Sequence, residues 1–204
     1  FGVDKNALGP TMNGLFQAVI DGSRIDINPF VIPPEQLTIW MRKAWKRQFP
    51  NRSRGPPVSH KVDSLSLLPA DLDLSGIEIE LAMRIGREHR LRIALERAME
   101  QFDLIIIDTP ASLGLLTVNA LTAADWLLIP IQAEFYALES MGQLLDTLRK
   151  VQSRVNPSLK LLGITMTMVQ TGSNLGKMVG DSALRHFGER ILRTSIPRSV
   201  SIAE

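Results

Sequence analysis

Short aliphatic runs that alternate with longer helical patterns constrain the fold of this chain more than any other feature. From residue 64 onward the runs occupy residues 64–70, 103–108, 125–132, 160–169 and 191–197. They lack alternation of polar and apolar residues, which is typical of strands covered on both faces, and each intervening stretch is long enough for a crossover helix. The pattern predicts an α/β fold with a doubly wound, mostly parallel sheet flanked by helices.

Two of the intervening stretches carry distinct helical patterns. Residues 86–102 combine an apolar stripe with charges four residues apart on the opposite side, which predicts an ordinary surface helix. The stripe consists of Leu91, Leu95, Ala98, Met99 and Phe102. The pattern that begins at residue 134 ends at Asn156-Pro157, because proline restricts the residue before it, so we expect a helix of about five turns there.

The composition fits one soluble globular domain spanning residues 1–204. With 45% apolar and 22% charged residues, a chain of 204 residues can bury one sizeable core. No window approaches the roughly 18 to 20 consecutive apolar residues of a membrane span, and the N-terminus lacks the pattern of a signal peptide. The chain has no cysteine, which excludes disulfides and thiolate zinc sites, and its three histidines show no ligand spacing. The simplest interpretation is a cytosolic protein without a structural metal.

Residues 30–62 differ from the alternating part and are interpreted as a basic insertion. Proline pairs flank them, and seven cations but no acid lie between Arg42 and Lys61. On a helical wheel, apolar residues around Trp40 and Trp45 face away from four cations, which are Arg42, Lys43, Lys46 and Arg47. Such a helix can pack on its own domain with the cations in water, lie on DNA phosphates, or rest on anionic lipid. Lys177 and Arg185 are further candidates for DNA contact.

An aspartate closes the aliphatic run at residues 103–108. Ligands of open α/β sheets bind at the carboxyl ends of strands, where loops meet helix N-termini. Asp108 at such an end could hold Mg²⁺ beside bound phosphates, and Ser112 would open the next helix near the same ligand. The alternative is a turn or capping role for Asp108.

The sequence around Asp108 closely resembles one family. Residues 103–151 read DLIIIDTPASLGLLTVNALTAADWLLIPIQAEFYALESMGQLLDTLRKV, similar to the Walker B region of the ParA/Soj partition ATPases, which typically reads D-x-I-I-I-D-x-P-P-S-L-G. The stretches SLSLLPADLDLSGIEIEL, NPSLKLLGITMTM and HFGERILRTSIPRSVSIAE also resemble segments of that family. The resemblance covers roughly residues 1–25 and 63–204, and it implies a P-loop NTPase-like fold.

The resemblance also implies a nucleotide site that uses ATP and Mg²⁺. Asp108 would be the Walker B carboxylate and metal ligand, and Thr109 to Gly114 would form the loop that senses the terminal phosphate. The loop candidates are Thr109, Pro110, Ser112 and Gly114. The adenine would lie against Met168, Ile196, Pro197 and Arg198. Two departures from the family are VQTGSN after the strand at residues 160–169, where an Asp and an Arg are frequent, and Ala111 in place of a proline.

The family's glycine-rich phosphate loop is not found in residues 1–204. The stretch GSNLGKM at residues 172–178 has three residues between its glycines instead of four, and Met178 instead of Ser or Thr after the lysine. Ser173 or Asn174 is better interpreted as a helix N-cap. We therefore expect the sequence to be incomplete at both ends, to lack ATPase activity as it stands, and to leave strand edges unpaired and an apolar seam exposed.

Three functions remain open from the sequence. The first is a partition ATPase for chromosomes or plasmids, a homodimer in its ATP-bound form that binds DNA nonspecifically, is stimulated by a ParB-like partner and associates with the nucleoid in the cytoplasm. The second is a degenerate or truncated relative that binds DNA or protein without hydrolysis. The third, a MinD-like membrane switch, would need a C-terminal amphipathic anchor, which SIPRSVSIAE does not provide.

Overall fold

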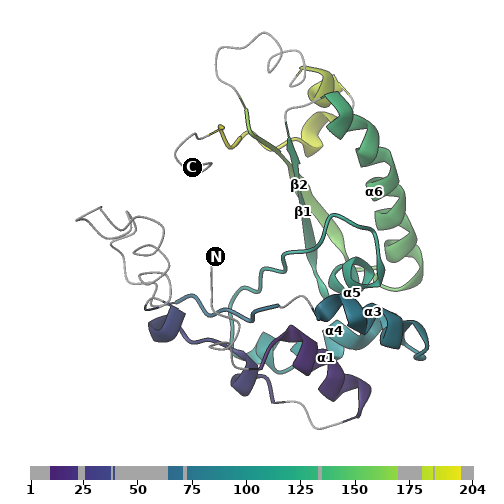
Figure 1. Cartoon of the computed structure of the whole chain (residues 1–204). Helices are drawn as coiled ribbons and strands as arrows, with labels where there is room; N and C mark the ends of the chain where they lie inside the picture. The colour runs from purple at the N-terminus through teal and green to yellow at the C-terminus, as the bar shows by residue number, and fades with distance from the viewer. Residues whose placement is uncertain are drawn as a thin grey trace. The chain divides into compact units, whose positions relative to one another are not determined.

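A computed structural model describes residues 10–22, 26–37, 39, 64–70, 73–132, 135–169, 181–185 and 187–198. The chain divides into two compact units, Phe1–Ile106 and Ile107–Glu204, which are described separately below (Figure 1). Most of the predicted insertion at residues 30–62 lies outside the described residues. The single domain of residues 1–204 therefore stays a prediction.

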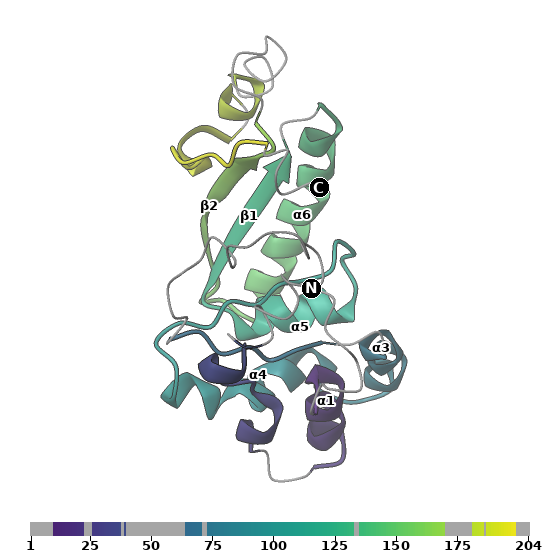
Figure 2. The ribbon, with the colours of Figure 1, turned by 60° about the vertical axis from the view of Figure 1, so that its left-hand side comes forward.

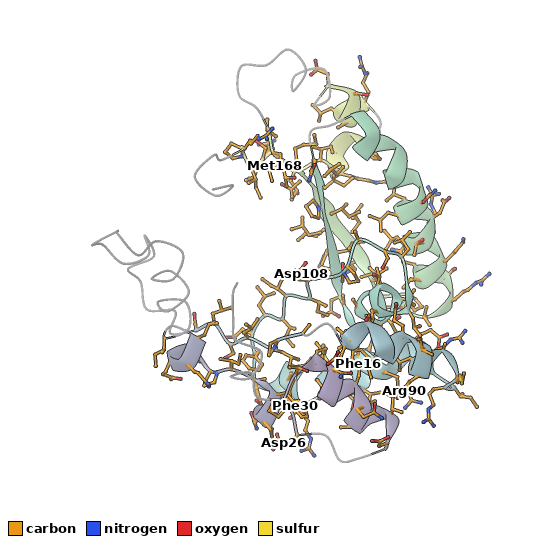
Figure 3. All side chains as sticks on the ribbon, viewed as in Figure 1. Phe16, Asp26, Phe30, Arg90, Asp108 and Met168 are labelled. Atoms are coloured by element: carbon orange, nitrogen blue, oxygen red, sulfur yellow. The ribbon has the colours of Figure 1, made fainter. Side chains whose placement is uncertain are left out.

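Within the described ranges of the first unit, three short α-helices surround a small apolar core. These are α1 (Met12–Ile20), α3 (Leu74–Ala82) and α4 (Arg90–Leu95), with 3₁₀ turns η2 (Asn28–Phe30), η3 (Arg87–His89) and η4 (Ala98–Glu100). Helix α1 contacts both α3 and α4. The buried side chains of these helices include Leu15, Phe16, Val19, Ile77, Leu81, Leu91 and Leu95. Figure 3 labels Phe16 among them.

Two arginines donate to backbone carbonyls at the end of α3 and in the connection to α4. The Arg87 guanidinium donates to the Ala82 carbonyl at 2.6 Å, and the Arg90 guanidinium donates to the Ile85 carbonyl at 2.7 Å. Carbonyls at a helix C-terminus have no partner within the helix, and cations are favoured there by the helix dipole. Arg87 therefore satisfies a carbonyl at the end of α3, and Arg90 holds the connection at Ile85 against the start of α4.

The helix predicted over residues 86–102 is divided into η3, α4 and η4. Leu91, Leu95 and Ala98 are buried as the stripe requires, but Met99 is exposed, so its predicted place in the core is wrong. A 3₁₀ turn has three residues per turn instead of 3.6, and the stripe therefore loses its phase beyond Ala98, where η4 begins.

Two of the predicted strands do not form ladders within the described residues. The run at residues 64–70 makes one antiparallel bridge, in which Ile32 and Leu67 exchange backbone hydrogen bonds of 2.8 and 3.0 Å. The run at residues 103–108 is not assigned to a strand, and Leu104 and Ile106 are 76% and 82% exposed. These predictions were wrong because a strand needs a paired neighbour, which the composition of a run does not guarantee.

The second unit contains a parallel βαβ arrangement. Helix α5 (Leu115–Ala123) leads into β1 (Trp126–Gln132), α6 (Phe135–Arg154) returns beside the strands, and β2 (Lys160–Thr167) pairs with β1 in parallel (Figures 1 and 2). Helix α6 has 20 residues and ends just before Asn156-Pro157, which confirms the predicted helix of about five turns. The α/β class with a parallel sheet is also confirmed.

Burial on β1 follows the alternation of a strand with one covered face. Ile129 and Ile131 are buried and pack with Ile164 of β2, while Leu144 and Leu145 of α6 lie against them. Trp126 and Leu128 are 55% and 46% exposed, so the predicted cover on both faces of this strand is wrong for the described residues. Leu162 of β2 is exposed as well. The expected exposed apolar seam is thus present on these strands.

The last predicted strand, at residues 191–197, lies beside β2 with irregular pairing. Parallel bridges join Ile164 to Ile191 and Val169 to Pro197. The Leu192 amide donates to the Ile164 carbonyl and the Ile196 amide donates to the Met166 carbonyl, each at 2.8 Å. Gly163 permits this close approach, since a Cβ there would lie 2.5 Å from Leu192 Cδ2. The segment is a neighbour of β2 but not a regular strand.

Candidate nucleotide site

The predicted base-binding residues meet at the carboxyl end of β2. Met168 has a φ of 54°, a left-handed conformation that is uncommon outside glycine, and it turns the chain beyond the strand (Figure 3). The following residue, Val169, donates its amide to the Ile196 carbonyl at 3.2 Å and accepts from the Arg198 amide at 3.1 Å. Met168, Ile196, Pro197 and Arg198, predicted from two separate stretches of the sequence, therefore lie together, and all four are exposed.

The loop after Asp108 leads into the N-terminus of α5. Asp108, Thr109, Pro110 and Ser112 are exposed, and Gly114 occupies the N-cap position with its carbonyl accepting from the Val118 amide at 3.1 Å. The prediction that Ser112 opens this helix is wrong, because the helix begins at Leu115. The Ser112 carbonyl instead accepts the Thr117 hydroxyl at 2.6 Å. That bond ties the loop to the first helical turn.

Buried polar side chains fix the orientation of α5. Asn156, which is buried, donates its side-chain amide to the carbonyls of Leu121, Thr122 and Ala124 at 3.0, 3.2 and 2.8 Å. These carbonyls belong to the last turn of α5 and its C-cap, where no helical partner is available. From the sequence, Asn156 was interpreted only as the residue that precedes Pro157 at the end of the helix. A polar amide that follows a long amphipathic helix was the signal that could have indicated this role.

The N-terminus of α5 suits an anion. Helix α5 has nine residues and no acidic side chain in its first turn, so no carboxylate of that turn offsets the positive end of the helix dipole. Helix N-termini of this kind accept phosphates. Asp108 and the loop at residues 109–114 precede this turn directly. In Figure 3, Asp108 and Met168 occupy separate positions along the direction of the strands.

Comparison with known proteins identifies the family. A family model described as an AAA domain matches residues 55–161, more than half of the chain. The sequence is 47% identical over 143 residues to the sporulation initiation inhibitor protein Soj of Bacillus subtilis, covering 70% of this chain and 56% of that protein. It is 42% identical over 149 residues to the chromosome partitioning protein ParA of Caulobacter vibrioides, covering 72% of this chain and 56% of that protein. The chain belongs to the ParA/Soj family. It spans about half the length of these curated relatives.

Solved structures support a P-loop NTPase fold for this ParA/Soj chain. Cobyrinic acid a,c-diamide synthase from Mycobacterium smegmatis, with a bound ATP analog and magnesium, matches with a TM-score of 0.74 and 31% identity. The match covers 97% of this chain and 68% of that chain. An ATP complex of an McdA variant from Cyanothece matches with a TM-score of 0.71 at 20% identity, covering 97% of this chain and 66% of that one, which indicates the fold alone.

The residues present fit Mg²⁺ held together with a nucleotide better than a site made of protein ligands alone. In the part of the chain that the structure describes, no three His, Cys, Asp or Glu side chains converge as metal ligands. Mg²⁺ commonly keeps several waters and takes only one or two carboxylates beside substrate phosphates. Asp108 has an exposed carboxylate, the chemical group that such a site uses.

Most of the predicted DNA-binding residues fall outside the described residues. These are Arg42, Lys43, Lys46, Arg47 and Lys177, and the suggested N-cap at Ser173 or Asn174 lies outside them too. Arg185 is described and exposed, at the end of the helical residues 181–185. Among the helices that the structure describes, none has the length and apolar character needed to span a bilayer.

Proposed function

We propose that this chain is part of a ParA/Soj-type partition ATPase that binds ATP with Mg²⁺ and acts in chromosome or plasmid partitioning. The observation that carries the proposal is the pairing of Val169 with Ile196 and Arg198, which joins the predicted base-binding residues at the carboxyl end of β2. Relatives named Soj and ParA support the choice of function.

In this proposal, Asp108 would hold the Mg²⁺ of the nucleotide, directly or through a water. Bound Mg²⁺ supplies charge neutralisation of the phosphates during phosphoryl transfer. The loop at residues 109–114 would lie against the phosphates, beside the positive end of the α5 dipole. Met168 and Ile196 would offer exposed apolar side chains to the base.

Hydrolysis is not proposed for these 204 residues alone. A lysine-bearing phosphate loop does not occur in them, and that element supplies much of the electrostatic stabilisation of phosphoryl transfer. The residues described above would contribute the metal, phosphate-sensing and base contacts.

The proposal extends to partners. We expect an ATP-dependent homodimer that binds DNA nonspecifically through its cations and responds to a ParB-like protein, acting at the nucleoid in the cytoplasm. Arg185 is a described, exposed cation available for phosphate contact, and Lys177 with the basic residues 42–47 would add to it. The relatives named chromosome partitioning proteins support this extension.

The test is a titration with fluorescent ATP, with and without Mg²⁺, comparing wild type with Asp108→Asn. We expect the variant to lose at least about tenfold in Mg²⁺-dependent affinity, since even indirect metal partners contribute that much. Asp103→Asn is the matched control, because Asp103 is an exposed carboxylate at the start of the same run. An unchanged Mg²⁺ requirement in Asp108→Asn would remove that carboxylate from the site. A wild type that binds no nucleotide would favour the non-hydrolysing binding module.

A further inference from the structure

The side-chain hydroxyls of two threonines in β2 form hydrogen bonds to different neighbouring segments. The buried Thr165 donates its hydroxyl to the Thr194 carbonyl at 3.0 Å, and Thr167 donates its hydroxyl to the Ile131 carbonyl of β1 at 3.2 Å. Residues two apart on a strand face the same side. The strand thus presents two hydroxyls in equivalent positions, one bonded to the segment at residues 191–198 and the other to β1.

The segment at residues 191–198 bulges where Thr165 contacts it. Two backbone bonds flank the bulge, from the Leu192 amide to the Ile164 carbonyl and from the Ile196 amide to the Met166 carbonyl. Between these bonds the segment advances by four residues while β2 advances by two. Residues 193–195 therefore have no regular register with β2, and the bond from the Thr165 hydroxyl to Thr194 lies in the middle of them.

The bulge decides which residues reach the end of β2. Because it takes up two extra residues, Ile196 rather than an earlier residue pairs with Met166 and Val169, which brings Pro197 and Arg198 beside Met168. Bulges next to binding sites characteristically re-aim side chains in this way.

We propose that Thr165 is a positioning residue for nucleobase recognition. Its hydroxyl fixes the bulge at residues 193–195 and so sets where Ile196, Pro197 and Arg198 stand relative to Met168. The inference rests on the proposed function, because it assigns Thr165 to the base end of that nucleotide site. It adds a residue that would not itself touch the nucleotide.

The experiment compares Thr165→Val, Thr165→Ser and Thr167→Val in the full chain. Valine keeps the shape and removes the hydroxyl, serine keeps the hydroxyl, and Thr167→Val removes an equivalent hydroxyl that bonds to β1. Calorimetry gives the affinities for ATP, GTP and inorganic triphosphate, each with Mg²⁺. Amide hydrogen exchange at Ile196 and Arg198 reports the bulge independently of any ligand.

We expect Thr165→Val to weaken ATP binding by about three- to tenfold, the effect of losing one ordinary hydrogen bond. Its preference for ATP over GTP should fall, its triphosphate affinity should stay unchanged, and exchange at Ile196 should accelerate. Thr165→Ser and Thr167→Val should behave as wild type. A Thr165→Val chain with wild-type base preference, or with equal losses for ATP and triphosphate, would overturn the proposal.

Failure of the proposed function gives a different result. A wild type that binds none of the three ligands overturns the nucleotide site and the assignment of Thr165 to a base. Hydrogen exchange at Ile196 and Arg198 then tests, without any ligand, whether the Thr165 hydroxyl stabilises the bulge. Unchanged exchange at Ile196 in Thr165→Val overturns the role of the hydroxyl itself.

Discussion

Two aliphatic runs of similar sequence, residues 103–108 and 126–132, have different surroundings in the structure. The second run is β1, which pairs in parallel with β2 and buries Ile129 and Ile131 beneath α6. The first run is outside any strand ladder in the described part of the chain, with Leu104 and Ile106 largely exposed. An apolar run can form a strand. It becomes one only where a neighbouring backbone pairs with it and a helix covers its apolar face.

The largest effect should come from truncating a side chain in the paired region. Ile164→Ala removes a fully buried side chain that packs with Ile129 and Ile131, and we expect it to lower the free energy of unfolding by about 2–5 kcal/mol. Ile106→Ala makes the same chemical change in the unpaired run and should alter stability by less than about 0.5 kcal/mol. Urea denaturation measures both. Equal losses would mean that Ile106 is buried in solution and that the contrast between the runs is absent.

A smaller effect should follow from crowding the contact between β2 and residues 191–198. Gly163→Ala would bring a Cβ within 2.5 Å of Leu192 Cδ2, which forces the segment away and costs about 1–3 kcal/mol. Gly142→Ala is the control, since nothing lies within 4 Å of that position in α6 and alanine favours helix by about 0.5–1 kcal/mol. Thermal unfolding should therefore move in opposite directions for the two variants. If Gly163→Ala leaves the unfolding temperature unchanged, residues 191–198 do not pack closely on β2.

The smallest effect on stability is expected for a substitution at a solvent-exposed position of the unpaired run at residues 103–108. Leu104→Gln replaces an exposed apolar side chain, so the free energy of unfolding should change by less than about 0.5 kcal/mol. Exposed apolar runs with unpaired backbone promote association, so the variant should also aggregate less. Light scattering at increasing concentration checks this. A destabilised variant would place Leu104 in a packed environment.

The candidate site was predicted in two ways. Asp108 was chosen because a carboxylate closes an aliphatic run, whereas the loop to Gly114 and the group around Met168 and Ile196 were implied by the family resemblance. The structure brings the last group together. The start of α5 was misplaced because Ser112 is a good capping residue by type, whereas the helix begins after Gly114. The Thr165 bulge could not be predicted, because it depends on a hydrogen bond between residues 29 positions apart.

The sequence by itself determined the parallel βαβ order, the length of α6 with its end before Asn156-Pro157, and the family. Periodicity and proline act over a few residues, so the order of elements and the helix length are written locally, while the family follows from the resemblance of longer motifs. Only the tertiary structure decided that residues 103–108 pair with no strand among the described residues, that Met99 faces solvent, and that Asn156 holds the end of α5. Each of these depends on which distant backbone or side chain becomes a neighbour, and contacts of that kind form only when the chain folds.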